Sequence, residues 1–501
     1  MLIKDYLKEF KYPQSYQKMS DLLQKIEQLE RLSEALEPDE DLRNHYLKLT
    51  HTFANKFIES LPTADSYSQN KVNNELFEID GKPHDLDELL DIYETEVTQK
   101  GISPASGGHI GYIPGGGLYL SALGDYLADV TNEYAGMYFG GPGAVTMENE
   151  LLNWLKNIFG FSRESVGNLT SGGSIANLVA LTAARDHHGI KNGKVEKAVV
   201  YLSAQVHHCI QKAIRIIGLE DLVVREIAID QNSKIDVIHL KKCIVEDKRK
   251  GLQPFLIVAS AGTTDTGAID PLDEIGTIAK NENCWFHIDA AYGGFFILCE
   301  RVKHQFKGIE KADSLVVDPH KGLFLPYGIG AVLVKNKEAV FKSHHYTANY
   351  MQDAFIEGLP TNPADVSPEL TKHFRGMRMW LPLKIHGIAP FKACLEEKLH
   401  LTTYFREQLI QRGFKVGPEP DLSVSYFWYP KTENELEFNK KLIQEIHKDG
   451  RIFLSSSVIQ GKQVIRIAVL SFRTKKATID RCLEMIDCCL DRITHSHNIS
   501  E

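Results

Sequence analysis

The amino-acid sequence predicts an α/β fold in which a mostly parallel sheet carries helices on both faces. Between residues 197 and 334, short apolar runs alternate with longer stretches of helical periodicity. Parallel strands need long connections, usually helices, so this alternation favours a parallel sheet over a meander. A glycine-led helix precedes the alternating region, and more closely spaced strands follow it. These observations predict one large α/β domain with a smaller domain after it.

The length of the chain is more than one hydrophobic core usually serves. It has 501 residues, of which 43% are hydrophobic and 25% charged, as in ordinary globular proteins. We expect an N-terminal helical arm (1–100), a large α/β domain (101–380) and a small C-terminal α+β domain (381–501).

Charge and cysteine content restrict the class of partner. The formal net charge is -9, which argues against nucleic acid or an anionic membrane, since both select basic surfaces. The first residues lack the apolar core of a signal peptide, and no apolar stretch is long enough to cross a bilayer. The eight cysteines show no metal-ligand spacing, which predicts reduced thiols, no bound metal and a cytoplasmic protein.

The first hundred residues predict helices with little core of their own. Amphipathic patterns cover residues 20–36 and 39–60, and each ends beside a proline, at Pro38 and Pro62. Such an arm usually packs on a larger body or on a second subunit. We therefore expect it to serve dimerisation.

A glycine-rich region with two predicted helices (118–132 and 148–159) leads to a helix that starts at Gly172, Gly173 and Ser174 and stops at Gly189. The free backbone N–H groups at a helix start form a cradle for a phosphate. By itself this pattern is more often structural.

The central region contains six runs that we expect to be strands, separated by helices at 207–217, 236–250 and 271–281. The runs are AVVYL (198–202), LVVREIAI (222–229), FLIVAS (255–260), WFHID (285–289), SLVVD (314–318) and GAVLV (330–334).

Lys321 lies just past the fifth run, in the segment ADSLVVDPHKG (312–322). Pro319 ends the strand, because proline cannot continue a hydrogen-bonded ladder. Ligands bind at the carboxyl ends of strands in open α/β sheets, and a lysine held there can attack a carbonyl group. The alternative is a solvated loop lysine, which most isolated lysines are.

Residues at the ends of other predicted strands have side chains that could act together with this lysine. Asp289 ends the apolar run WFHID, and a buried carboxylate needs a partner, either an arginine or a cationic ring nitrogen. His207 follows the first run, and Thr264 follows the third. A lysine for a Schiff base, an acid for a pyridine nitrogen, a phosphate cradle and a flat residue together predict pyridoxal 5'-phosphate (PLP).

The order of these motifs resembles the group II PLP-dependent amino-acid decarboxylases, which include aromatic, histidine, glutamate and diaminobutyrate enzymes. The resemblance covers roughly residues 105 to 490 and rests on TSGGSIANLVAL, SAQVHHCIQKA, AGTTDTGAIDPLDEI, HIDAAYGG and DSLVVDPHKG. It implies the PLP-dependent transferase fold of the aspartate aminotransferase superfamily (fold type I), a homodimer with the active site at its interface, and the small C-terminal domain over the site.

The resemblance also assigns roles to single residues. Lys321 would form the Schiff base with the cofactor, Asp289 would pair with its pyridine nitrogen, and His207 would stack on its ring. The remaining contacts would come from Ala291 on the other ring face, Thr264 at the ring substituents, Gly172, Gly173 and Ser174 at the phosphate, and His320 beside the lysine.

Tyr350 bears on the type of reaction. It matches the family's loop tyrosine, which protonates the substrate's alpha carbon after carbon dioxide leaves, and relatives that form aldehydes often lack it. The resemblance therefore implies decarboxylation of an L-amino acid to an amine. A loop tyrosine that only packs at the dimer contact is the alternative.

The substrate prediction favours an aromatic or other apolar amino acid. Tyr112, Ile113 and Pro114 resemble the pocket wall of the aromatic branch, whereas TSGGS resembles the glutamate and diaminobutyrate branches. Asp318 stands where aromatic members usually carry asparagine. A carbon-carbon lyase, an aldehyde-forming enzyme and a catalytically silent binding protein remain alternatives, and an aminotransferase is the least favoured.

After residue 380 the sequence predicts a long helix over 381–412, strands within 422–430, 450–460 and 462–470, and a final helix over 477–493. We expect these elements to form the small α+β domain.

Overall fold

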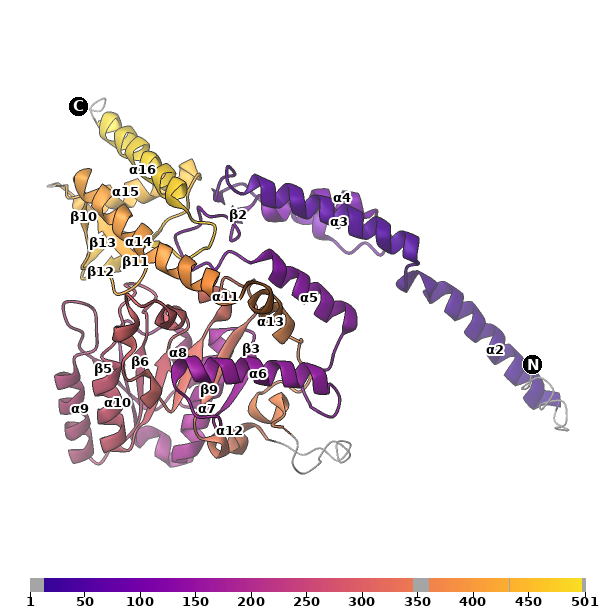
Figure 1. Ribbon diagram of the computed structural model, residues 1–501, viewed down its shortest axis with the longest axis horizontal. Helices are drawn as coiled ribbons and strands as arrows, with labels where there is room; N and C mark the ends of the chain where they lie inside the picture. The colour runs from indigo at the N-terminus through magenta and orange to yellow at the C-terminus, as the bar shows by residue number, and fades with distance from the viewer. Residues whose placement is uncertain (1–12, 346–359, 432, 498–501) are drawn as a thin grey trace. The chain divides into compact units, whose positions relative to one another are not determined.

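The computed structural model describes residues 13–345, 360–431 and 433–497 (Figure 1). The chain divides into two compact units. One comprises Met1–Leu61 and Val72–Gln99, and the other Pro62–Lys71 and Lys100–Glu501.

The first unit is helical. Its helices are α2 (Pro13–Ser33), α3 (Glu40–Ser60) and α4 (Leu86–Ile92), which continues as a π-helical turn over Tyr93–Thr98. Asp39 caps α3 by accepting a hydrogen bond from the Leu42 backbone N–H at 2.8 Å. These elements confirm the two predicted helices, the first of which begins earlier than expected. Leu29 and Leu32 on α2 are 55% and 72% exposed, so this helix buries little apolar surface within the single chain.

A seven-stranded sheet forms the centre of the second unit. Its order is β3-β9-β8-β7-β6-β4-β5, and β9 runs antiparallel to both neighbours while the other pairs are parallel. The strands are β3 (Val166–Thr170), β4 (Ala198–Ser203), β5 (Val223–Ile227), β6 (Gln253–Ser260), β7 (Trp285–Asp289), β8 (Ser314–Val317) and β9 (Gly330–Val334). All six predicted runs are strands. Strand β3 was not predicted, because its residues VGNLT include a glycine and an asparagine, which are poor strand formers.

The two faces of the sheet carry separate layers of helices, as predicted (Figure 1). Successive strand residues point to opposite faces, so Tyr201 packs into one apolar cluster and Val200 into the other. On the Val200 side lie α7 (Gly173–His188), α8 (Cys209–Ile216) and α12 (Lys337–His344). The Tyr201 side is covered by α6 (Pro142–Phe159), α9 (Val237–Arg249) and α10 (Leu272–Glu282). Helices α5 (Tyr119–Thr131) and α13 (Gly376–His386) pack on each other.

A four-stranded antiparallel sheet of order β10-β11-β13-β12 follows. Its elements are α14 (Ala389–Gln411), β10 (Lys415–Val416), β11 (Val424–Trp428), α15 (Glu435–Asp449), β12 (Ser455–Ile459), β13 (Lys462–Ala468) and α16 (Lys476–His497). The predicted single helix over 381–412 is wrong. Gly387 adopts a φ of 65° that ends α13, and Pro390 lies in the first turn of α14.

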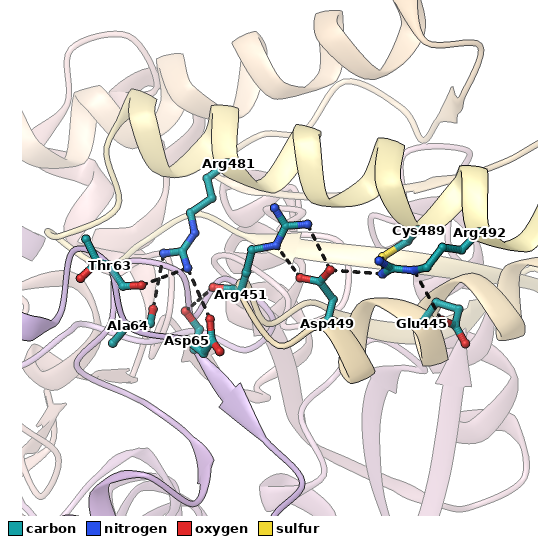
Figure 2. Close-up of polar contacts among 10 residues, drawn as sticks. Thr63, Ala64, Asp65, Glu445, Asp449, Arg451, Arg481, Cys489 and Arg492 are labelled. Carbon is teal, nitrogen blue, oxygen red and sulfur yellow. Dashed lines mark hydrogen bonds and ion pairs between the residues drawn. The ribbon is translucent and has the colours of Figure 1, made fainter.

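The segment 62–71 is held on this part of the second unit. Figure 2 shows Arg481 of α16 donating to the backbone carbonyls of Thr63 at 3.1 Å and Ala64 at 3.4 Å. Ser66 adds two bonds, from its hydroxyl to the Arg451 carbonyl at 3.0 Å and from its N–H to the Gly450 carbonyl at 2.9 Å. This short segment, which separates the two stretches of the first unit in the sequence, is thereby anchored on the second unit.

All eight cysteines are unbridged. Within the described residues, no helix combines the length and the apolar character needed to cross a bilayer.

A buried ion pair joins α6, β3 and the segment before α13. Lys372 Nζ lies 2.6 Å from Glu148 Oε2, and the two side chains are 0% and 1% exposed. Lys372 also donates to Asn168 Oδ1 at 3.1 Å, while Glu148 Oε1 accepts from the Gly376 N–H at 3.0 Å.

We expect Lys372→Met to destabilise the protein strongly, by about 3–5 kcal/mol, because it leaves a buried carboxylate unpaired. The apparent melting temperature should fall, and the double variant Glu148→Gln/Lys372→Met should recover much of the loss. A single variant as stable as the native protein would contradict this role of the pair.

Candidate active site

A cavity of about 260 Å³ opens at the carboxyl ends of the parallel strands. It brings together nine of the ten residues predicted from the sequence, while the tenth, Tyr350, lies outside the described residues. The nine are Gly172, Gly173, Ser174, His207, Thr264, Asp289, Ala291, His320 and Lys321.

The start of α7 forms one wall. Gly172 adopts a φ of 154°, which residues other than glycine rarely adopt, and α7 begins at the next residue. The first N–H groups of a helix have no partner within it, so this wall offers donors to an anion. Gly173 is also required sterically, because a Cβ there would lie 2.8 Å from Asp318 Oδ2.

Lys321 is paired with Asp318. The Nζ–Oδ2 distance is 2.9 Å, and Asp318 is only 1% exposed. Burial lowers the pKa of Lys321, but the carboxylates of Asp318 and Asp289 outweigh it, so the pKa is raised. Asp318 Oδ1 is buried and has no hydrogen-bond partner among the described residues. The charge of Asp318, unexplained from the sequence, is therefore compensated by the lysine.

Asp289 is 7% exposed at the end of β7. Its Oδ1 accepts from the Ala291 N–H at 3.1 Å, and its Oδ2 accepts from Asn177 Nδ2 at 3.2 Å. Neither donor is a cation, so this carboxylate has no ion-pair partner at contact distance among the described residues.

The histidines of the site favour their neutral forms. Burial lowers the pKa of His207, with partial opposition from Asp289, and burial likewise lowers the pKa of His320. His207 Nδ1 accepts from the Cys209 N–H at 3.3 Å, which places a ring proton on Nε2. His320 Nδ1 donates to the Ile329 carbonyl at 2.5 Å.

Arg466 on β13 holds the loop that carries Thr264. It donates to the Thr264 carbonyl, to the Asp265 carbonyl at 3.2 Å and to the Gly111 carbonyl at 2.9 Å. Arg466 and Asn177 were not predicted as functional residues. The one available signal for Arg466 was a charged residue inside the apolar run VIRIAVL.

A family model described as the pyridoxal-dependent decarboxylase conserved domain matches residues 76–430. The chain belongs to the pyridoxal-dependent decarboxylase family. It is 32% identical over 450 residues to an aromatic-L-amino-acid decarboxylase of Bacillus atrophaeus, covering 88% of this chain and 93% of the relative. It is 30% identical to tryptophan decarboxylase 2 of Oryza sativa subsp. japonica, over 81% of this chain and 85% of the relative.

The fold agrees with this membership. The crystal structure of Oryza sativa TDC with PLP and tryptamine superposes with a TM-score of 0.84 at 22% identity, covering 91% of this chain and 99% of that one. The predicted fold type I architecture is thus confirmed.

The cofactor of this pyridoxal-dependent decarboxylase is PLP, and its site residues fit that group. Among the described residues that line the cavity, Lys321 carries the only primary amine, which an aldehyde requires. The carboxylate of Asp289 suits a protonated ring nitrogen, and the glycine-led start of α7 suits a phosphate.

We expect Asp318→Asn to speed the covalent attachment of PLP to Lys321 at neutral pH. Without the carboxylate, burial lowers the pKa of Lys321, so more of the amine is unprotonated and nucleophilic. The rise of visible absorbance after mixing apoprotein with PLP should accelerate, and its pH profile should move to lower pH. Asp313→Asn, at the opposite edge of the sheet, is the control. An unchanged profile would contradict the proposed effect of Asp318.

Proposed function

We propose that this decarboxylase converts an aromatic L-amino acid into the corresponding amine and carbon dioxide, and that it works as a homodimer in the cytoplasm. The observation that carries the proposal is the convergence of a paired lysine, a carboxylate and a glycine-led helix start on one cavity. The division into an arm (1–100), a large domain (101–380) and a small domain (381–501) is part of this proposal.

Each residue has a task in the proposed mechanism. Bound PLP supplies an electron sink for the pair left when carbon dioxide departs. Asp289 would hold a proton on the ring nitrogen by opposite-charge stabilisation, and the neutral ring of His207 would lie against the cofactor. Lys321 Nζ would hold the cofactor covalently. The start of α7 would bind the phosphate. Ala291 would contact the other face of the ring and Thr264 its substituents, while His320 would lie beside Lys321.

The aromatic substrate is supported by the relatives, two of which are named for aromatic amino acids. The segment Tyr112–Gly117 also lies against the lysine loop, because a Cβ on Gly115 would approach the His320 carbonyl oxygen to 2.2 Å. Tyr112 is 54% exposed and is not among the described residues that line the cavity, so its place in the pocket wall stays a prediction.

The homodimer is supported by apolar surface that the single chain leaves exposed. Leu123, Tyr126 and Val130 on α5 are 37%, 52% and 65% exposed. Exposed apolar patches of this kind mark protein interfaces. Sedimentation analysis should give twice the chain mass, and a monomer at working concentration would contradict this part of the proposal.

The test of the reaction is a panel of L-amino acids assayed for carbon dioxide and for amine. Aromatic amino acids should give equal amounts of both. Release of an aldehyde and ammonia would indicate an aldehyde-forming enzyme, and no turnover of any aromatic amino acid would refute the proposed substrate class.

Tyr350, proposed to protonate the alpha carbon, is tested by Tyr350→Phe. Amine formation should be abolished while PLP binding persists, because phenylalanine has no proton to donate. Tyr346→Phe in the same segment is the matched control. Unchanged amine production by Tyr350→Phe would rule out this role.

A further inference from the structure

A chain of buried hydrogen bonds runs behind the active site and ends on Asp289. Trp285, His287 and Asp289 alternate along β7, so their side chains share the face of the sheet that α7 covers. His287 pairs in register with Ser314 on the adjacent strand β8. Asn177 comes from α7, one turn after the predicted phosphate-binding residues.

The contacts are continuous, and the chain reaches the cavity at Asn177 and Asp289. Trp285 Nε1 donates to Ser314 Oγ at 2.8 Å, and Ser314 Oγ lies 2.8 Å from His287 Nδ1. His287 Nε2 lies 2.7 Å from Asn177 Oδ1, and Asn177 Nδ2 donates to Asp289 Oδ2 at 3.2 Å. Asn177, His287 and Ser314 are each 0% exposed.

The direction of donation follows from chemistry. An ionised Asp289 only accepts, so it requires the Asn177 amide nitrogen on its side and leaves the amide oxygen facing His287. That oxygen requires a proton on His287 Nε2. Burial lowers the pKa of His287 to about 3, so the ring is neutral and Nδ1 accepts from the Ser314 hydroxyl. The Trp285 N–H can only donate, and it fills the remaining place on Ser314.

We infer that Asn177 and His287 are positioning residues that hold the Asp289 carboxylate correctly oriented toward the cofactor, through hydrogen bonds that all donate in the direction of the carboxylate. Reversing any link would place two acceptors or two donors against each other. The Ala291 N–H holds the other carboxylate oxygen, so Asp289 is constrained at both atoms. This inference rests on the proposed pairing of Asp289 with the ring nitrogen.

The test measures the dissociation constant of PLP and the absorbance of the bound cofactor. Asn177→Leu, similar in shape but unable to donate, should bind PLP about tenfold more weakly, the loss expected for one hydrogen bond to a charged group. Asn177→Asp should lose at least as much, because it still accepts from His287 but presents a second carboxylate to Asp289. Both variants should change the visible spectrum of the bound cofactor.

Non-additivity separates positioning from packing. If His287 acts through Asn177, His287→Leu should weaken PLP binding alone but add little to Asn177→Leu. His287→Gln should recover most of the affinity, since its amide can accept from Ser314 and donate to Asn177. Asn439→Leu, at an equally buried asparagine in α15, should leave PLP binding and the spectrum unchanged.

Native-like affinity and spectrum in both Asn177→Asp and Asn177→Leu, or fully additive losses in the double variant, would overturn the inference. If a leucine variant does not fold, Asn177→Asp and His287→Gln still decide it, because they change polarity with little change in shape. Asp289→Asn distinguishes a failure of the proposed role of Asp289 from a failure of the hydrogen-bond chain behind it. Native-like PLP binding and spectrum in that variant would refute the role of Asp289 itself, whereas altered binding there with native-like Asn177 variants would refute only the chain.

Discussion

Replacing Lys321 with alanine is expected to abolish decarboxylation and the visible absorbance of covalently bound PLP. No other described residue lining the cavity offers a primary amine. The loss of activity should be roughly 10⁴-fold or more, the scale found when a catalytic nucleophile is removed. Carbon dioxide release and the absorbance spectrum after addition of PLP measure the two effects.

The same substitution should also destabilise the apoprotein. Asp318, 1% exposed, would become a buried carboxylate without its cation, at a cost of about 3–5 kcal/mol. The double variant Lys321→Ala/Asp318→Asn should regain stability but not activity. Lys321→Arg keeps a cation for Asp318 but cannot form the covalent bond with PLP. An inactive Lys321→Arg variant would show that activity requires the covalent bond and not only the positive charge. Full activity in Lys321→Arg would disprove the assignment.

Replacing Asp289 with asparagine is expected to lower kcat by about 10²–10³-fold, the range for removal of one preorganised electrostatic group. Asparagine is nearly isosteric, but it carries no charge to hold a proton on the ring nitrogen, so the electron sink weakens. PLP should still attach to Lys321. Steady-state rates of carbon dioxide release, with the spectrum as a check on attachment, provide the measurement.

Asp313→Asn is the matched control for this variant. Asp313 accepts from the Phe286 N–H at 2.8 Å near the start of β7, whereas Asp289 ends the same strand. The control should affect stability but not kcat. Equal losses of kcat in the two variants would point to a structural effect and against the proposed pairing of Asp289.

Much of the fold and several residues of the active site could be predicted from local sequence patterns. Short apolar runs separated by stretches of helical periodicity predicted six strands of the large sheet, because a strand that is covered on both faces is apolar along most of its length. Lys321, Asp289 and His207 were identifiable because parallel strands deliver their exits to one edge, so residues after separate strands meet there. The glycines before α7 were visible for a similar reason, since a phosphate cradle is built from consecutive residues.

The tertiary structure decided the contacts between distant segments. Asn177 lies 112 residues before Asp289, and Arg466 lies 202 residues after Thr264, and nothing in either local pattern names its partner. Strand β3 depends on pairing with β9 rather than on its own propensity. The role of Asp318 could not be predicted from the sequence, because the energetic effect of a buried carboxylate depends on the groups within a few ångströms of it. In the folded chain, Lys321 Nζ lies 2.9 Å from Asp318 Oδ2.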